Sequence, residues 1–445
     1  MKSKTKLLSI ASVVGLASAV GLVSCAKDEL KEVAGEYLGV TFTTSVTRAT
    51  PTTLTELDAF YVYADADGYS NLLIDGLTAT KTGNTGDYVL DKNVIWPADV
   101  DKIRFWAYGP SKVKNNVTAN FSAMSQALSG IEVKPDFQNG GKDHQDLVVA
   151  YTHAERDKTT GMRIPLTFHH AMSQIEVRLK LGQGAEDDGY VVKVKGAWMM
   201  NVHSKGTLAF EETSDANHMK WTTNTSGNYG RYVESGVSLQ SSTTVNMISN
   251  ETGSEYSSLM VLPQKFVGYK FDNTCTSTTA EEETSTNNPN IGDNTSGTYI
   301  MVLCRVEVEH RTGSGESGSG DSQQNTAIKP IEVNGQVVGH AHQLFPISKD
   351  DMDNVIFKED AYGYTCVPIS GEWLPGKKYI YTLEFCGSNS GAGVYPPEQP
   401  DEPEGVTPPD DKKPGDPVLD SPITFSVTVE DWKTPEGWED KTPMP

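Results

Sequence analysis

The stretch "YLGVTFTTSVTR" (Tyr37–Arg48) alternates apolar and polar side chains, which is the pattern of a half-buried β-strand. One face carries Leu38, Val40, Phe42 and Val46, and the other carries Gly39, Thr41, Thr43 and Ser45. A strand of this kind needs a partner for its backbone hydrogen bonds and a core for its apolar face. The rest of the chain should therefore supply further strands.

Short β-branched and aromatic runs ending in turn residues follow along the chain, including "LDAFYVYAD", "KIRFWAYGP", "HQDLVVAYT" and "TYIMVLCRVEVEH". Only "SAMSQALSG" and "SKDDMDNVI" are candidates for short helices. Strands at this spacing without interleaved helices predict an all-β protein of antiparallel sandwiches. A boundary is expected at 158–162, where "DKTTG" separates two series of strands.

The C-terminal end repeats the alternation of the first strand. In "ITFSVTVEDW", Ile423, Phe425, Val427 and Val429 share one face. A Pro-rich acidic stretch at 387–422 precedes it and is expected to be an extended linker. The sequence leaves open whether this strand completes its own domain or pairs with another molecule.

The first 24 residues have the features of an export signal. Three lysines precede an apolar run, Leu7–Val23, that is short for a spanning helix. "LVSC" then matches a lipobox, which predicts signal-peptidase cleavage between Ser24 and Cys25 and a lipid on Cys25. The alternative is a secretory signal or a membrane anchor in which Cys25 is incidental. Lys27, Asp28 and Glu29 resemble the acidic signal that directs lipoproteins of Bacteroidota to the cell surface.

The net charge of the whole chain is −22, and removal of the three lysines of residues 1–24 lowers it to −25. Such a surface repels phosphate backbones, so we expect no nucleic-acid partner. An exported chain can oxidise its remaining cysteines, and four of them allow three pairings that the sequence leaves open. These cysteines are Cys275, Cys304, Cys366 and Cys386.

Catalytic and metal-binding patterns are weak throughout. Asp65, Asp67 and Gly68 resemble a calcium loop, but the first and last ligand positions are wrong and a turn is expected. His340 and His342 share a face of a possible strand, yet no third ligand is identifiable, so we assign no metal site. We also expect no cofactor and no enzymatic activity.

A second group of polar and aromatic residues has structural explanations. His169 and His170 lie in a strand-like run and should pack, and the aspartates of 350–353 suit a solvated turn. Trp221 and Tyr229 are candidates either for stacking on sugars or for anchoring loops.

Several segments together resemble the fimbrillin family of Bacteroidota, the Mfa-like and major fimbrillin subunits of type V pili. In chain order, the segments are the lipobox, "VTRAT", "RFWAYGP", "DLVVAYT", "LTFHHAMSQIEV", "LMVLPQ", "GEWLPGKKYIYTLEF" and "ITFSVTVEDW".

The resemblance implies two tandem transthyretin-like β-sandwich domains, and the expected divisions follow from it and from the patterns above. These are a signal peptide (1–24), a lipidated propeptide with the first strand (25–48), an N-terminal domain (49–160), a C-terminal domain (161–386), the linker (387–422) and the final strand and tail (423–445).

The family resemblance also implies an assembly route. A trypsin-like, Arg-specific surface protease would cut between Arg48 and Ala49 and release the first strand with its lipid. Another subunit's strand would fill the groove, so the partners are other fimbrillin subunits in a homo- or heteropolymer. The expected location is the outer membrane and then the fimbrium, with a host or bacterial surface ligand for adhesion. Alternatives are an uncleaved anchor or tip subunit, and a surface glycan-binding lipoprotein.

Overall fold

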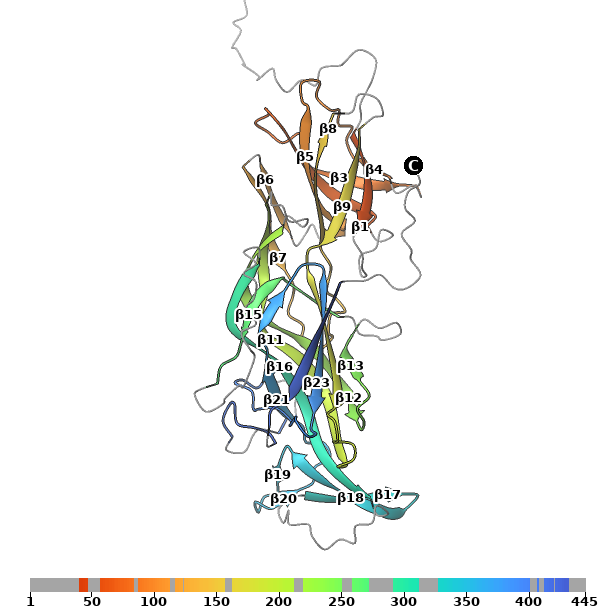
Figure 1. Cartoon of the computed structure of the whole chain (residues 1–445), viewed down its shortest axis with the longest axis vertical. Helices are drawn as coiled ribbons and strands as arrows, with labels where there is room; N and C mark the ends of the chain where they lie inside the picture. Colours follow the sequence, from red (N-terminus) through yellow and green to blue (C-terminus); the bar gives the residue numbers. More distant parts are fainter. Residues whose placement is uncertain are drawn as a thin grey trace, which may run out of the picture.

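The protein is described by a computed structural model. It describes residues 40–46, 57–83, 87–112, 117–122, 124–156, 162–211, 219–249, 258–271, 291–311, 327–400, 406–407, 412–419 and 421–431. These ranges contain β-strands and no α-helix, so the all-β prediction is confirmed. The molecule is elongated, with one unit at the top of Figure 1 and two packed sheets below it.

The upper unit is a closed barrel in the order β1-β4-β3-β2-β5-β8-β9. Its strands are β1 (Val40–Val46), β2 (Ala59–Ala66), β3 (Ile74–Thr82), β4 (Asp87–Leu90), β5 (Lys102–Gly109), β8 (Val148–Glu155) and β9 (Met162–His170). Large inward-facing side chains, among them Phe60, Phe105 and Phe168, fill the interior. The alternation of burial along β9, where Ile164 and Leu166 are buried between exposed neighbours, follows from this closure.

The lower unit has two main sheets. The first is a five-stranded sheet of β10 (Ser173–Leu181), β13 (Val245–Ile248), β14 (Leu259–Val261), β23 (Lys377–Phe385) and β24 (Thr424–Asp431). The second is a ten-stranded sheet of β6 (Thr118–Ser122), β7 (Ser125–Glu132), β11 (Tyr190–Phe210), β12 (Met219–Leu239), β15 (Gln264–Gly268), β16 (Gly292–Arg311), β17 (Ala327–Val333), β18 (Gln336–Phe345), β21 (Gly363–Pro368) and β22 (Gly371–Trp373). A small pair, β19 (Ser348–Lys349) and β20 (Val355–Ile356), lies beside them at the bottom of Figure 1.

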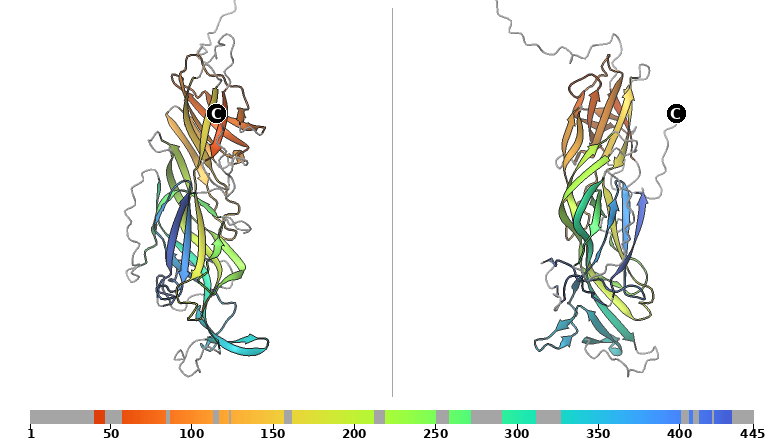
Figure 2. Two further views of the ribbon diagram at one scale, coloured as in Figure 1. Left: turned by 45° about the vertical axis from the view of Figure 1, so that its right-hand side comes forward. Right: turned by 60° about the vertical axis from the view of Figure 1, so that its left-hand side comes forward.

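The two sheets lie face to face as separate layers in the right-hand view of Figure 2. Buried side chains from both sheets, such as Ile175 and Leu383 from one and Val192 and Val302 from the other, form one core. This is the layered packing expected of a β-sandwich.

The hairpin β6–β7 joins the barrel to the lower unit. It follows β5 in sequence, but β7 pairs with β11 of the ten-stranded sheet. Phe121 stacks on Tyr63 of the barrel at 4.3 Å between ring centroids and lies 5.8 Å from Phe210 below. This hairpin was one of the two candidate helices, and that prediction was wrong. The other, 348–356, forms β19, a turn and β20.

Two further expectations differ from the observed pairing. The barrel continues through His170, about ten residues past the expected boundary, because β9 closes it against β1 and β8. The Pro-rich segment at 387–422 is not an extended linker in its described parts. Val394 is buried and bridges to Cys366 and to Pro417, so the segment packs along the lower unit.

Candidate functional site

β1 completes the barrel by pairing on both of its edges. It runs antiparallel to β4, with Phe42 opposite Tyr88, and parallel to β9, with Phe42 opposite Ile164. The backbone N–H of Val40 also donates to the carbonyl of Val94 at 3.0 Å. Without β1, both β4 and β9 would have an unpaired edge.

The inward face of β1 contributes to the barrel core. Val40 and Phe42 are buried, and Phe42 meets Phe60 and Phe105 edge-on at centroid distances of 6.2 and 5.8 Å. The hydroxyl of Tyr88, opposite Phe42, donates to the carbonyl of Leu57 at 2.6 Å, and burial raises the pKa of this phenol. Burying two large apolar side chains is worth roughly 3–6 kcal/mol before ordering costs.

An ion pair crosses over the outward face of β1. Arg163 of β9 lies opposite Thr41, Asp87 of β4 lies opposite Thr43, and their side chains meet above the strand. Both partners are partly exposed, so the pair contributes only about 0–1 kcal/mol. It nevertheless links the two strands that would flank a groove left by β1.

β24 is the edge strand next to β23, and both views of Figure 2 show it on the outside of the lower unit. Ile423, just before it, is buried, whereas the next three apolar residues are not. Phe425 is 37 % exposed, Val427 41 % and Val429 55 %. They lie opposite the buried Leu383, Tyr381 and Tyr379, so they are on the core-facing side of the sheet. At this edge, however, the rest of the chain covers them only in part.

The two terminal strands thus have matching sequence patterns and opposite burial. The described apolar side chains of β1, Val40 and Phe42, lie inside a core, while the apolar face of β24 is only about half covered by its own chain. Comparison with known proteins gives the family of the region between these two strands. The sequence model of the fimbrillin-like family matches residues 47–317.

The chain belongs to the fimbrillin-like family. Membership supports a fimbrial, cell-surface role and a structural rather than enzymatic function, and it confirms the resemblance seen in the sequence. A comparison with curated proteins found no match.

Solved structures similar to this fimbrillin-like chain include several proteins of Bacteroides. A fimbrial protein of Bacteroides vulgatus has 13 % identity and a TM-score of 0.48, with 88 % of this chain and 99 % of that one covered. A candidate cell adhesion protein of Bacteroides uniformis has 13 % identity and a TM-score of 0.34, with 89 % of this chain and 99 % of that one covered. A candidate cell adhesion protein of Bacteroides eggerthii has 10 % identity and a TM-score of 0.37, with 91 % of this chain and 98 % of that one covered.

Many of the site residues predicted from the sequence lie outside the described residues of this fimbrillin-like chain. They are Ser24, Cys25, Lys27, Asp28, Glu29, Leu38, Arg48, Ala49 and the side chain of Val46. The structure describes β1, which precedes the expected cut. The cut itself and the lipidation site remain predictions. No helix within the described ranges is long and apolar enough to cross a membrane.

The weaker candidates prove to be structural. Asp65 is buried and paired with Arg104, and Gly68 has a positive φ of 87° in the turn that follows. Nδ1 of His170 lies 2.6 Å from the Asp146 carboxylate, both buried. The carboxylate of Asp350 accepts from the backbone of Asn354 within an exposed turn.

The two aromatic candidates for sugar stacking are buried. Trp221 and Tyr229 lie in the main core, and the Tyr229 hydroxyl donates to the carbonyl of Val133 at 2.7 Å. A side chain in the core cannot present its ring to a glycan, so the sugar-stacking interpretation is wrong for both, which are core residues of β12.

Among the described cysteines, Cys304 and Cys386 are buried and are not joined in disulfides. Burial raises the pKa of both thiols, that of Cys386 to about 12. Cys366 is buried as well, and Cys275 lies outside the described residues.

Proposed function

We propose that this chain is a structural subunit of a type V pilus that assembles by strand exchange. It is exported as a lipoprotein anchored through Cys25 and reaches the surface through Lys27, Asp28 and Glu29. An Arg-specific protease then cuts after Arg48, which frees β1. The observation that supports this best is the contrast between β1, buried in the barrel, and β24, half exposed at an edge.

Loss of β1 would convert the barrel into an acceptor. The chain leaves β1 at Val46 and re-enters the barrel at β2, so a cut after Arg48 leaves β1 held by non-covalent contacts alone. Its departure exposes the edges of β4 and β9 and the cavity filled by Val40 and Phe42. A strand of the same alternation can restore both the main-chain bonds and the apolar packing.

β24 fits the role of donor because its own chain buries it incompletely. Its three outer apolar side chains have on average about two-fifths of their surface exposed. Since full burial of such a side chain gives roughly 1.5–3 kcal/mol, transfer into a closed barrel would add about 2–4 kcal/mol. β24 must first leave β23, where main-chain pairing and the ion pair of Lys377 with Asp431 hold it.

The packing of the described parts of 387–422 limits how the donor can move. Ile423 is buried, and Thr424 N–H donates to the Ser390 hydroxyl at 2.9 Å. The exchanging piece is therefore the strand from Thr424 onward, peeling from a fixed base, rather than a whole extended linker. An uncut chain, with β1 and β24 both in place, would instead serve as a lipid-anchored base or tip subunit.

The partners in this proposal are other fimbrillin subunits, the maturation protease and the membrane through the lipid, with adhesion to a host or bacterial surface ligand as the outcome. A glycan-binding lipoprotein is the weaker alternative, because both aromatics proposed for it are buried.

Three variants expressed in the native cell test the proposal. Electron microscopy should show filaments with the wild type and none with Arg48→Ala, while N-terminal sequencing of surface protein should begin at Ala49 only in the wild type. Fatty-acid labelling should be lost in Cys25→Ala. Replacing Lys27, Asp28 and Glu29 with Ala should hide the chain from external protease. Filaments built from Arg48→Ala would overturn the maturation step.

A further inference from the structure

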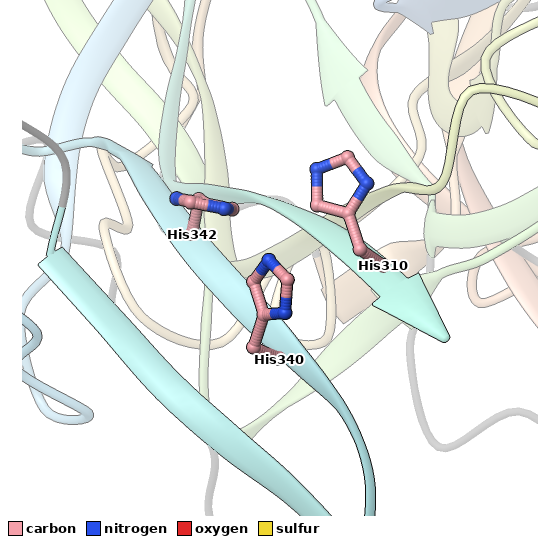
Figure 3. Close-up of side chains that lie close together, drawn as sticks. All are labelled: His310, His340 and His342. Atoms are coloured by element: carbon pink, nitrogen blue, oxygen red, sulfur yellow. The ribbon is translucent and has the colours of Figure 1, made fainter. Parts of the chain in front are cut away.

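Three histidines come together at the end of the molecule farthest from the barrel. His310 is near the end of β16, and His340 and His342 are on β18. His310 lies directly opposite His340 in the antiparallel register, and His342 is two residues farther along the same face. Figure 3 shows the three imidazoles on one side of the sheet, turned toward one another.

The geometry of this histidine cluster is that of a ligand set. One ring nitrogen from each residue lies within 4.8 Å of the others. The ring centroids are 5.2, 5.3 and 4.9 Å apart, so no fourth side chain separates them. Burial is graded, since His342 is buried, His340 is intermediate and His310 is exposed. The cluster is thus fixed at one side and open to solvent at the other.

The described surroundings leave the three imidazoles as the ligand set. The group as described includes no carboxylate. The neighbouring acid, Glu309, alternates to the opposite face of β16 and pairs there with Arg311. On β17, Ile328 and Pro330 lie opposite His342 and His340 and flank the cluster with apolar surface. Each neutral imidazole offers one nitrogen lone pair, and a metal ion can use all three at once.

A close approach of the two backbones sets the spacing of the cluster. Gly339, next to His340, lies opposite Arg311, and a Cβ at this position would be 2.2 Å from the carbonyl oxygen of His310. Any other residue at this position would push β18 away from β16 and separate His340 from His310.

We propose that His310, His340 and His342 form a zinc-binding site. Zinc binds imidazole nitrogen at about 2.0–2.1 Å, which in tetrahedral geometry places the nitrogens about 3.3 Å apart. Rotation of the rings reduces the present nitrogen–nitrogen separations, which are up to 4.8 Å, to this value, and the exposed His310 has room to rotate. The fourth position faces solvent and takes water or a side chain of another molecule. Copper(II) and nickel(II) also suit imidazole sites, and zinc is the member of this group without redox chemistry.

Equilibrium dialysis of the purified full chain, without a polyhistidine tag, against zinc chloride tests this site. The wild type should bind one zinc per chain. His310→Gln and His340→Gln should each weaken binding at least about 100-fold, since even residues that only orient a metal ligand contribute 10–100-fold. His153→Gln, which changes an exposed strand histidine in the barrel, is the matched control and should bind as the wild type does.

Two further readouts separate loss of the site from loss of the fold. Without metal, His310→Gln should have the same melting temperature as the wild type. Zinc should raise the melting temperature of the wild type and of the His153→Gln control only. Cobalt(II) should give the visible spectrum of a tetrahedral site in the wild type and not in the His340→Gln chain. No bound zinc in the wild type, or equal affinity in His310→Gln and His153→Gln, would overturn the proposal.

Discussion

Truncation of Phe42 should loosen β1 from the barrel without disturbing the lower unit. The ring of Phe42 is fully buried and packs edge-on against Phe60 and Phe105. Removing a buried phenylalanine side chain costs about 3–5 kcal/mol, because transfer energy is lost and a cavity remains. β1 is a short strand of seven residues, so we expect most of this cost to fall on the binding of β1 itself.

Hydrogen exchange of the uncut chain, followed by mass spectrometry, measures this cost locally. Amides of β4 and β9 that bond to β1 should exchange about 150- to 5,000-fold faster in Phe42→Ala, since about 1.4 kcal/mol is a factor of ten. Thr43→Ala, on the outward face of the same strand, should change exchange by no more than about 0.5 kcal/mol.

The same variant gives a second comparison after proteolysis. Once the chain is cut after Arg48 and β1 is removed, Phe42→Ala and the wild type are the same molecule, so their exchange rates should coincide. Unchanged protection of β9 in the uncut variant would refute the view that β1 closes the barrel through Phe42.

Three further outcomes follow from the packing. The double variant Phe425→Asp with Val427→Asp should still fold, losing about 2–4 kcal/mol in chemical denaturation, because both side chains are already partly exposed; a denatured product would contradict the exposure of β24. Cys304 and Cys386 of the native protein should resist alkylation, and rapid labelling of the native protein at pH 8 would exclude their burial. Burial raises the pKa of the Cys386 thiol from an ordinary 9.0 to about 12. The contribution of this buried thiol to the free energy of unfolding is therefore complete below pH 9 and is lost as the pH rises toward 12. Asp146→Ala should lower the free energy of unfolding by about 1–3 kcal/mol, because it removes a partner of the buried His170. An unchanged denaturation midpoint would show that this contact does not contribute to stability.

The sequence predicted those features that depend on local alternation. Val40 and Phe42 share a face in the pattern and are buried together, and the run of strands was sufficient for the all-β class. The same reasoning failed at "SAMSQALSG" (122–130), where a short apolar pattern without strict period two was interpreted as a candidate helix and most of the segment instead belongs to β7. The surface of the barrel and β11 decide the structure there, through contacts such as that of Phe121 with Tyr63.

Long-range register lay beyond the sequence. His340 and His342 were recognised as sharing a face, but their third partner, His310, is about thirty residues away and becomes a neighbour only through the pairing of β16 with β18. The bridge of Arg163 and Asp87 across β1 was missed for the same reason. The pairing of β24 with β23 was left open, and the structure shows it in the single chain.

Polymerisation of cut subunits, observed on an unboiled gel, tests strand exchange most directly. The wild type should give a ladder after cleavage, and Arg48→Ala should remain a full-length monomer. Phe425→Asp with Val427→Asp should give cut monomers and no ladder, because carboxylates cannot enter a dry groove without partners. Ser426→Asp with Thr428→Asp places the same two charges on the polar face of β24 and should still form a ladder. A full ladder from the variant with charges on the apolar face would contradict the account and show that β24 is not the donor.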